Sequence, residues 1–322
     1  MYVNLIVGFV LLLGGAEILV RGAVGLAERL GVSKLVIGMT VIAFGTSAPE
    51  LIVSLNATLN GSPGLAVGNL VGSNVANILL ILGVSGMIQS IKVDSKALTR
   101  DGWVLLLGTA AFIAFAVDGA FELYDGLLLL LMFSGFLYYT FDRERNGALQ
   151  HSANQYEQGV NEKAAVFHTF WIATLLVCIG FACLIGGSEL LVSGGVAIAR
   201  SFGISEAAIG LTIIAFGTSL PELAASAVAA YRKHTDLAVG NIVGSNLFNI
   251  LGIAGLIAVI TPMHVPSRIM YFDMWIMFAV TLILTPYLIG NKEVIGRTTS
   301  GFFVVAYLAY ITAVGYGIES FK

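Results

Sequence analysis

Charged residues are scarce in this chain. They make up 11% of its 322 residues, whereas soluble domains carry about 25%. Most of the apolar segments also lack the polar face that a surface helix of a soluble core would show at helical period. The two cysteines, Cys178 and Cys183, lie in the apolar run "LLVCIGFACLIGG", where we expect small hydrophobic residues rather than a disulfide or a metal centre. The composition therefore excludes an ordinary soluble domain.

Motifs of intramembrane catalysis are missing as well. The apolar segments contain no serine–histidine pair, no paired aspartates and no HExxH sequence. We therefore expect no enzyme, and we expect no cofactor and no nucleic-acid partner. The first residues, "MYVNLIVGFVLLLGG", lack the basic region and the cleavage site of a signal peptide, so we expect a retained helix there.

Long apolar runs dominate what is present. Hydrophobic residues make up 57% of the chain, and the mean hydropathy is +0.92. Many runs reach the roughly 20 residues that cross the hydrocarbon core of a bilayer. We predict an all-α integral membrane protein, embedded in the lipid bilayer as a multi-pass protein of the plasma membrane (the inner membrane if bacterial). Ten candidate spans lie near residues 2–20, 35–59, 65–87, 103–118, 123–141, 165–187, 205–231, 237–259, 270–290 and 300–318.

One polar stretch divides the ten spans into five and five. It runs from 142 to 163, "DRERNGALQHSANQYEQGVNEK", and we interpret it as a solvated linker. Basic residues mark the cytoplasmic loops of membrane proteins. Of the 16 Lys and Arg residues, 13 lie in the loops after the odd-numbered spans. This placement predicts that the linker is cytoplasmic and that both termini lie outside.

An internal duplication relates the two halves. Three segments recur without a gap at one constant offset, which carries Gly14 to Gly186 and Glu50 to Glu222. Because each unit holds an odd number of spans, the second copy must cross the membrane upside down. We therefore predict two inverted five-helix repeats, 1–141 and 164–322, an architecture typical of secondary transporters with a site between the repeats. The matching segments are "GGAEILVRGAVGLAERLGVS" and "GGSELLVSGGVAIARSFGIS", "GMTVIAFGTSAPEL" and "GLTIIAFGTSLPEL", and "LAVGNLVGSNVANIL" and "LAVGNIVGSNLFNIL".

Four glutamates fall within the apolar segments, three inside the predicted spans and Glu189 two residues beyond the end of one. An ionisable group there costs roughly 2.5–3.5 kcal/mol on insertion scales, and it indicates function by default. Glu50 and Glu222 lie about halfway along their spans, and we expect the twofold relation to bring them together at the centre. Glu17 and Glu189 lie close to span ends. For them we favour exposure at the interface or a packing hydrogen bond over a direct role with an ion.

A helix breaker precedes each central glutamate. Pro49 has no N–H, so the carbonyl of Gly45 loses its helical partner. Such a carbonyl is tolerated in a membrane only where it lines a cavity or finds another partner. Thr46 and Ser47 precede Glu50 by four and three residues, which places them on the same helical face. The second copy repeats this arrangement with Gly217, Thr218, Ser219, Pro221 and Glu222.

The next span carries a polar stripe. Asn69, Ser73 and Asn77 follow one another at four-residue spacing. For the first asparagine of each stripe, a hydrogen bond that joins helices and a ligand role both remain open. For the serine and the second asparagine we favour a ligand role. The counterparts in the second copy are Asn241, Ser245 and Asn249, while Asn74 and Asn246 lie one position off the stripes.

Every candidate ligand in these motifs offers oxygen. Oxygen-only sites suit Na⁺, Ca²⁺, Mg²⁺ or Mn²⁺ rather than zinc or copper. Ca²⁺ accepts six to eight oxygen ligands in loose geometry, which two broken helices can provide. Two glutamates neutralise one divalent cation, and the same site could hold several monovalent ones. This charge balance indicates competition between Ca²⁺ and Na⁺, and hence exchange.

The motifs "GTSAPE" with "GNLVGSNVAN", and their copies "GTSLPE" with "GNIVGSNLFN", resemble those of the cation/calcium exchanger superfamily. The likeness covers essentially the whole chain and is greatest to the prokaryotic sodium/calcium exchangers. It implies that the second, third, seventh and eighth spans form the site, and that the first and sixth slide across the bundle to alternate access.

The resemblance also implies a set of ligands. Asparagine at both 77 and 249, where potassium-dependent exchangers carry aspartate, resembles the potassium-independent branch. Exchange of about three Na⁺ for one Ca²⁺ is implied as well, and it would move net charge across the membrane potential. The implied ligands are Thr46, Ser47, Glu50, Ser73 and Asn77 with the backbone carbonyl of Ala43, and Thr218, Ser219, Glu222, Ser245 and Asn249 with that of Ala215.

Two alternatives compete with sodium/calcium antiport. Buried glutamates can also bind protons, so a proton/Ca²⁺ antiporter is the nearest one. The proton-coupled branch usually carries glutamate in the motif after the first site, where this chain has asparagine. A calcium channel is less favoured, because a duplicated site sealed between inverted halves argues for a carrier.

Overall fold

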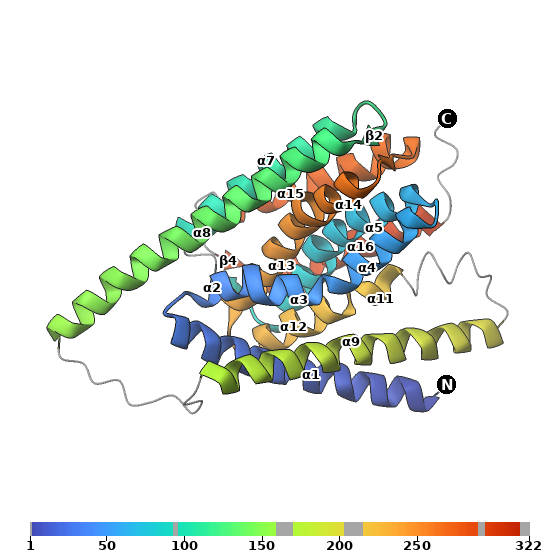
Figure 1. Cartoon of the computed structure of the whole chain (residues 1–322). Helices are drawn as coiled ribbons and strands as arrows, with labels where there is room; N and C mark the ends of the chain where they lie inside the picture. The colour runs from blue at the N-terminus through green and yellow to red at the C-terminus, as the bar shows by residue number, and fades with distance from the viewer. Residues whose placement is uncertain (1, 93–95, 159–169, 203–214, 289–293, 316–322) are drawn as a thin grey trace.

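The computed structural model describes residues 2–92, 96–158, 170–202, 215–288 and 294–315 (Figure 1). Almost all of these residues are helical. The helices of the first half are α1 (Tyr2–Leu30), α2 (Lys34–Ile37), η1 (Gly38–Ile42), α3 (Ala43–Thr46), α4 (Ala48–Leu59), α5 (Pro63–Ala76), η2 (Asn77–Ile81), α6 (Leu82–Ile88), α7 (Lys96–Ala116) and α8 (Leu123–Gln158). Those of the second half are α9 (Phe170–Ser201), α11 (Ala215–Thr218), α12 (Leu220–Tyr231), α13 (Thr235–Leu247), η4 (Phe248–Ile253), α14 (Ala254–Ile260), η5 (Ile269–Asp273), α15 (Met274–Leu288) and α16 (Arg297–Gly315).

The described helices are those of a membrane protein. Seven of them are long and apolar enough to cross a bilayer, and an eighth span results if the bent pair Lys34–Thr46 and Ala48–Leu59 counts as one. Large apolar side chains are exposed on the outer helices, among them Phe9 on α1, Leu131 on α8 and Phe302 on α16. In a bilayer these side chains face lipid rather than water.

Three helices are longer than the sequence predicts. α1 passes its predicted end at residue 20 and α9 passes residue 187. The predicted end of α8 at 141 is also wrong, because this helix continues to Gln158 through most of the polar stretch 142–163 (Figure 1). Polar residues such as Glu, Gln and Arg are good helix formers, so polarity alone does not end a helix. The last residues of the expected linker, 159–163, and the start of the seventh predicted span lie outside the described residues.

Helices α1 and α9 lie side by side in opposite directions along one edge of the molecule (Figure 1). Their contact on the α1 side is a row of glycines spaced by seven residues. A Cβ atom built on Gly8, Gly15 or Gly22 would lie 2.8, 2.6 and 2.8 Å from the nearest α9 atom. No side chain fits at these distances, so the two backbones approach as only small residues allow.

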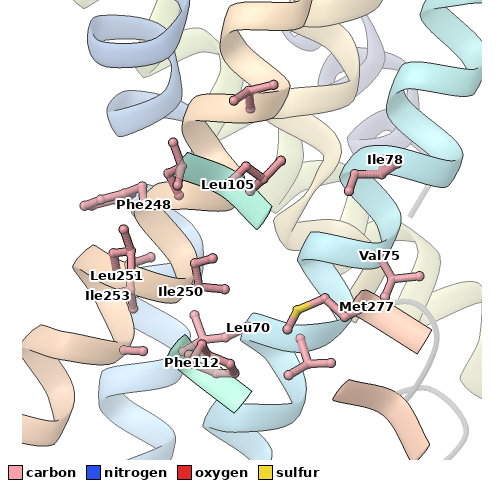
Figure 2. Close-up of a cluster of buried hydrophobic side chains, with 14 of the residues drawn as sticks. Leu70, Val75, Ile78, Leu105, Phe112, Phe248, Ile250, Leu251, Ile253 and Met277 are labelled. Atoms are coloured by element: carbon pink, nitrogen blue, oxygen red, sulfur yellow. The ribbon is translucent and has the colours of Figure 1, made fainter. Parts of the chain in front are cut away.

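The other helices pack around two central ones. In the most apolar stretches of Pro63–Ile88 and Thr235–Ile260, 72% and 89% of the residues are buried, against 33% for α1 and 28% for α9. Side chains of both halves of the chain form the main core, including Leu70, Phe112 and Phe248 (Figure 2). A separate cluster joins α1 and α9 to α12 through Leu19, Leu184 and other residues. The α1–α9 pair is therefore packed as a unit apart from the main core.

Two short β-ladders, which the all-α prediction missed, connect the repeats. Strand β1 (Ile91–Lys92) pairs antiparallel with β4 (Val294–Ile295), with Ile91 opposite Ile295. Strand β2 (Ala120–Phe121) pairs antiparallel with β3 (Met263–His264), with Phe121 opposite Met263. Each ladder joins one strand from each half of the chain. The repeat offset that carries Glu50 to Glu222 also carries β1 to β3, and it carries β2 to a position two residues before β4, so the two ladders are approximate counterparts.

Candidate cation-binding site

The first broken helix places a carboxylate at a helix start. Ser47 separates α3 from α4, and the two parts of this span are bent by 43°. Pro49 occupies the first turn of α4, where its missing N–H costs no helical hydrogen bond. Glu50 follows in the same turn, so the positive end of the α4 dipole faces the carboxylate. The break predicted from the proline is therefore present, and it orients the acidic side chain.

The second broken helix repeats the first. Ser219 separates α11 from α12, and Glu222 lies in the first turn of α12 after Pro221. One freed carbonyl has found a partner, because the Ser188 hydroxyl of α9 donates to the Gly217 carbonyl oxygen at 2.6 Å. The equivalent position on α1 is Ala16, whose side chain has no donor. The two breaks therefore differ in how their open carbonyls are satisfied.

The two central glutamates meet across the repeats, as the inverted symmetry predicts. The Ser47 hydroxyl donates to Glu222 Oε1 at 2.7 Å, and the Ser219 hydroxyl donates to Glu50 Oε1 at 3.2 Å. Each carboxylate is thus held by the serine of the other repeat. Both glutamates are 1% exposed. Among the described residues no Lys, Arg or His forms an ion pair with either of them.

The polar stripes lie next to these glutamates. α12 contacts η2, which begins at Asn77, and α4 contacts η4, which contains Asn249. Both asparagines are 1% exposed, and Ser73 and Ser245 are also buried. The wider π-helical turns at these positions were not foreseen from the sequence. Such turns often occur at functional sites, because they interrupt the regular ladder and re-aim side chains.

Several buried polar atoms at this place have no hydrogen-bond partner among the described residues. A buried polar atom without a partner costs about 1–3 kcal/mol, and a bound cation can offset this cost for the oxygens but not for the two amide nitrogens, Asn246 Nδ2 and Asn249 Nδ2. Five are oxygen atoms, which matches the ligands that Na⁺ and Ca²⁺ prefer. They are Glu50 Oε2, Glu222 Oε2, Asn77 Oδ1, Ser245 Oγ and Asn249 Oδ1. The donor set therefore fits a hard cation as cargo.

The carbonyls expected as ligands differ between the repeats. The Ala43 carbonyl accepts the backbone N–H of Ser47 at 3.0 Å and lies 3.5 Å from the Thr46 hydroxyl, so a cation bound there would share this oxygen with both donors. In the second repeat the Ser219 N–H bonds instead to the Phe216 carbonyl at 3.1 Å. Ala215 lies in α11, four residues before the break at Ser219.

The first asparagine of each stripe joins helices. Asn69 Nδ2 donates to Ser54 Oγ at 3.0 Å, and Asn241 Nδ2 donates to Ser226 Oγ at 2.9 Å. The Asn241 Oδ1 atom also accepts a hydrogen bond from Thr46 at 3.2 Å, across the repeats. Of the two roles left open by the sequence, the structure favours the structural one for both asparagines.

Glu17 and Glu189 make no hydrogen bond to the residues of the proposed site among the described contacts, and they do not lie near helix ends. Glu17 lies midway along α1, where it pairs with Arg21 of its own helix at 2.6 Å and with Arg232 at 2.5 Å. Glu189 lies on α9 and is exposed. The extra length of α1 and α9 explains why the predicted positions were wrong.

Two buried carboxylates were not predicted from the sequence. Asp101 is fully buried and pairs with Arg100 at 2.5 Å, while Asp273 is 6% exposed and accepts a hydrogen bond from Tyr310 at 3.0 Å. These aspartates are counterparts in the two repeats, and each lies two positions before a tryptophan. The repeat offset is therefore the signal that could have found them.

Comparison with known proteins agrees with this geometry. A family model described as "Sodium/calcium exchanger protein" matches residues 1–141 and 172–316. The chain belongs to the sodium/calcium exchanger family. It is similar to the putative antiporter CaxA of Alkalimonas amylolytica, at 37% identity with 95% of each chain covered. It is also similar to the sodium/calcium exchanger MaX1 of Methanosarcina acetivorans, at 31% identity with 98% of each covered.

The fold matches solved structures of this family. A structure of the sodium-calcium exchanger NCX_Mj, soaked with zero Na⁺ and Ca²⁺, superposes with a TM-score of 0.83 at 31% identity and covers 97% of each chain. Another NCX_Mj structure, soaked with Na⁺ and Ca²⁺, matches with a TM-score of 0.82. The chain is therefore a multi-pass membrane protein of a transporter family, not of an enzyme family, and its membership supports cation/Ca²⁺ antiport.

Proposed function

We propose that this exchanger couples Na⁺ movement in one direction to Ca²⁺ movement in the other, through one shared site between its repeats. The observation that carries the proposal is the pair Glu50 and Glu222, each buried and each held by a serine of the other repeat. Two carboxylates without a basic partner among the described residues neutralise one Ca²⁺. When Na⁺ ions replace Ca²⁺, they also neutralise the two carboxylates. The site therefore carries either Ca²⁺ or Na⁺ across the membrane, which couples the movement of one ion to that of the other.

The proposed site contains the twelve residues inferred from the motifs. Side-chain oxygens come from two threonines, four serines, two asparagines and two glutamates, and backbone carbonyls come from two alanines. The cross-repeat hydrogen bonds and the unpartnered oxygens support this set. Its members are Ala43, Thr46, Ser47, Glu50, Ser73, Asn77, Ala215, Thr218, Ser219, Glu222, Ser245 and Asn249.

The proposed topology has ten spans in two inverted repeats, 1–141 and 164–322, with both termini outside and 142–163 cytoplasmic. The constant offset between the repeats and the placement of basic residues support it. Helices α11 and α12 would belong to the seventh span and α16 to the tenth. Alternating access would then arise from sliding of the glycine-packed α1–α9 pair against the main core.

The proposed exchange is electrogenic and independent of K⁺. Asparagine at 77 and 249 leaves two carboxylates in the site. Roughly three Na⁺ for each Ca²⁺ would then carry one net charge, which the membrane potential drives. The alternative is proton/Ca²⁺ antiport, because the same glutamates could bind protons.

Proteoliposomes test the coupling ion. Vesicles loaded with Na⁺ and diluted into Na⁺-free medium should accumulate ⁴⁵Ca²⁺, and an inside-positive potential should accelerate this uptake because Na⁺ exit removes positive charge. External K⁺ should have no effect. Uptake driven by a proton gradient alone would contradict Na⁺ coupling and favour the alternative.

A further inference from the structure

Two asparagines that lie off the ligand stripes, Asn74 and Asn246, differ sharply in what they contact. Asn74 Nδ2 donates to the Leu70 carbonyl of its own helix at 2.8 Å. Asn246 instead reaches the other repeat, where its Oδ1 atom accepts a hydrogen bond from Asn77 Nδ2 at 2.9 Å. Asn246 is fully buried and Asn74 is 2% exposed, so neither contact is exchanged with water.

The contact to Asn246 decides which end of the Asn77 amide faces the site. An amide has an oxygen that attracts a cation at one end and an N–H₂ group that repels it at the other. Because Asn77 Nδ2 is engaged by Asn246, Asn77 Oδ1 is left buried and without a partner among the described residues. Rotation of the Asn77 amide alone would break this hydrogen bond and turn its N–H₂ group toward the cargo. Asn246 Nδ2, which also has no partner among the described residues, could replace the bond only if the Asn246 amide turned as well.

In the other repeat, no hydrogen bond among the described residues orients the amide of the equivalent ligand. Asn249 is the counterpart of Asn77, and both its Oδ1 and its Nδ2 lack partners among the described residues. Asn74, the counterpart of Asn246, is occupied by its own helix. One amide of the site is therefore oriented in advance, while the other is free to turn.

We propose that Asn246 is a positioning residue of this exchanger, which presents the Asn77 carbonyl oxygen to Ca²⁺ without touching the ion. This inference rests on the proposed function, because it takes Asn77 as a ligand. Preorganised ligands bind more tightly because the cost of orienting them is met on folding. Asn249, in contrast, would be oriented only by the bound ion.

Substitution of Asn246 tests the proposal in the full-length protein in proteoliposomes. Asn246→Ala and Asn246→Leu should raise the Ca²⁺ concentration for half-maximal uptake about tenfold, the effect of losing one oriented oxygen ligand. The maximal rate should stay within about twofold of the parent. Asn74→Ala is the matched control, and it should change the half-maximal concentration less than about twofold.

Repeating the Asn246 substitution in the Asn77→Asp variant distinguishes a positioning role of Asn246 from a purely structural one. In Asn77→Asp the carboxylate has two equivalent oxygens, so its orientation no longer matters. Adding Asn246→Ala to Asn77→Asp should therefore raise the half-maximal concentration by less than about threefold. An equal tenfold loss in both backgrounds, or parent-like affinity of Asn246→Ala, would overturn the positioning role. Failure of the parent protein to exchange Ca²⁺ for Na⁺ would instead overturn the proposed function.

Discussion

Each central glutamate accepts its hydrogen bond from the serine of the opposite repeat. Because Glu50 and Glu222 are buried without a basic partner among the described residues, their charge must be balanced by something other than a protein side chain. A transported cation meets this requirement. At the scale of single residues, the function therefore depends on two charges and on the oxygens around them.

Removing one of these charges tests that dependence. Glu50→Gln and Glu222→Gln should each weaken Ca²⁺ binding by about 3 kcal/mol or more, at least roughly a hundredfold, because a bound divalent ion loses half of its charge compensation. Equilibrium binding of ⁴⁵Ca²⁺ to the purified protein measures the change. Glu189→Gln, on the exposed face of α9, is the matched control and should bind as the parent does. Unchanged affinity in Glu50→Gln would remove this carboxylate from the site.

The hydrogen bond from Ser188 makes a separate prediction. Ser188→Ala leaves the Gly217 carbonyl, freed by Pro221, without its donor at 2.6 Å. Stability should fall by about 1–3 kcal/mol, as for a buried acceptor that loses its partner. Thermal unfolding in detergent measures this, with Ser201→Ala as the control, because the exposed Ser201 hydroxyl donates only to the Ile198 carbonyl of its own helix. Equal melting temperatures for both variants would show that this carbonyl is satisfied in another way.

Residue-scale prediction from the sequence succeeded where unusual residues mark a feature and failed where the partner lies far away in the sequence. A proline and a glutamate inside an apolar run are conspicuous, so the breaks at Ser47 and Ser219 could be foreseen. The donor for the Gly217 carbonyl is Ser188 of α9, which lies 29 residues away in the sequence, and no local sequence pattern indicates this contact. Asp101 and Asp273 were missed because they lie just outside or at the edge of the predicted spans.

At the scale of elements, the α1–α9 pair is held by glycines spaced by seven residues. The neighbouring glycines differ, because a Cβ atom on Gly14 or Gly186 would meet no described atom within 4 Å. Glycine count alone therefore does not indicate which positions are in contact. The spacing was visible in the sequence, but its partner surface was not.

Substitution at adjacent glycines tests the packing of this pair. Gly15→Leu should destabilise the protein by about 1–3 kcal/mol or displace α1, because a Cβ there would lie 2.6 Å from the Cys183 Cβ atom. Gly14→Leu, one position away, should be tolerated. Melting temperature and Na⁺-driven uptake report the two effects. Similar behaviour of both variants would contradict the close approach of the helices.

The contact between α2 and the start of α13 predicts a dependence on pH. His234 Nδ1 lies 3.4 Å from Lys34 Nζ. Burial lowers the pKa of His234, and the neighbouring Lys34 lowers it further, although Asp236 and Glu28 act in the opposite direction. A histidine whose pKa is lower in the folded than in the unfolded protein contributes stability above its ordinary pKa. That contribution is lost as the pH falls toward the lowered value.

The melting temperature should therefore fall more steeply for the parent than for His234→Gln as the pH decreases from about 8 through the ordinary histidine range. Glutamine can still accept a hydrogen bond from Lys34 but does not titrate. Parallel curves for the two proteins would show that His234 does not contribute to this pH dependence.

At the scale of the whole molecule, the repeat explains most of the architecture. A constant offset between the copies and an odd number of spans implied inversion, and the reciprocal serine–glutamate bonds have the symmetry that inversion requires. The two β-ladders follow the same symmetry approximately, but such short strands carry too little pattern to be predicted. The continuation of α8 was missed because hydropathy marks the edge of a membrane and not the end of a helix.

Competition between the two ions at equilibrium tests the shared site most directly. Binding of ⁴⁵Ca²⁺ to the purified protein should weaken steeply as Na⁺ rises, with a dependence on more than the first power of the Na⁺ concentration and with no change in the number of Ca²⁺ sites. Choline at equal ionic strength should have little effect. Simultaneous binding of Na⁺ and Ca²⁺, with Ca²⁺ affinity independent of Na⁺, would contradict a single site shared by Glu50 and Glu222.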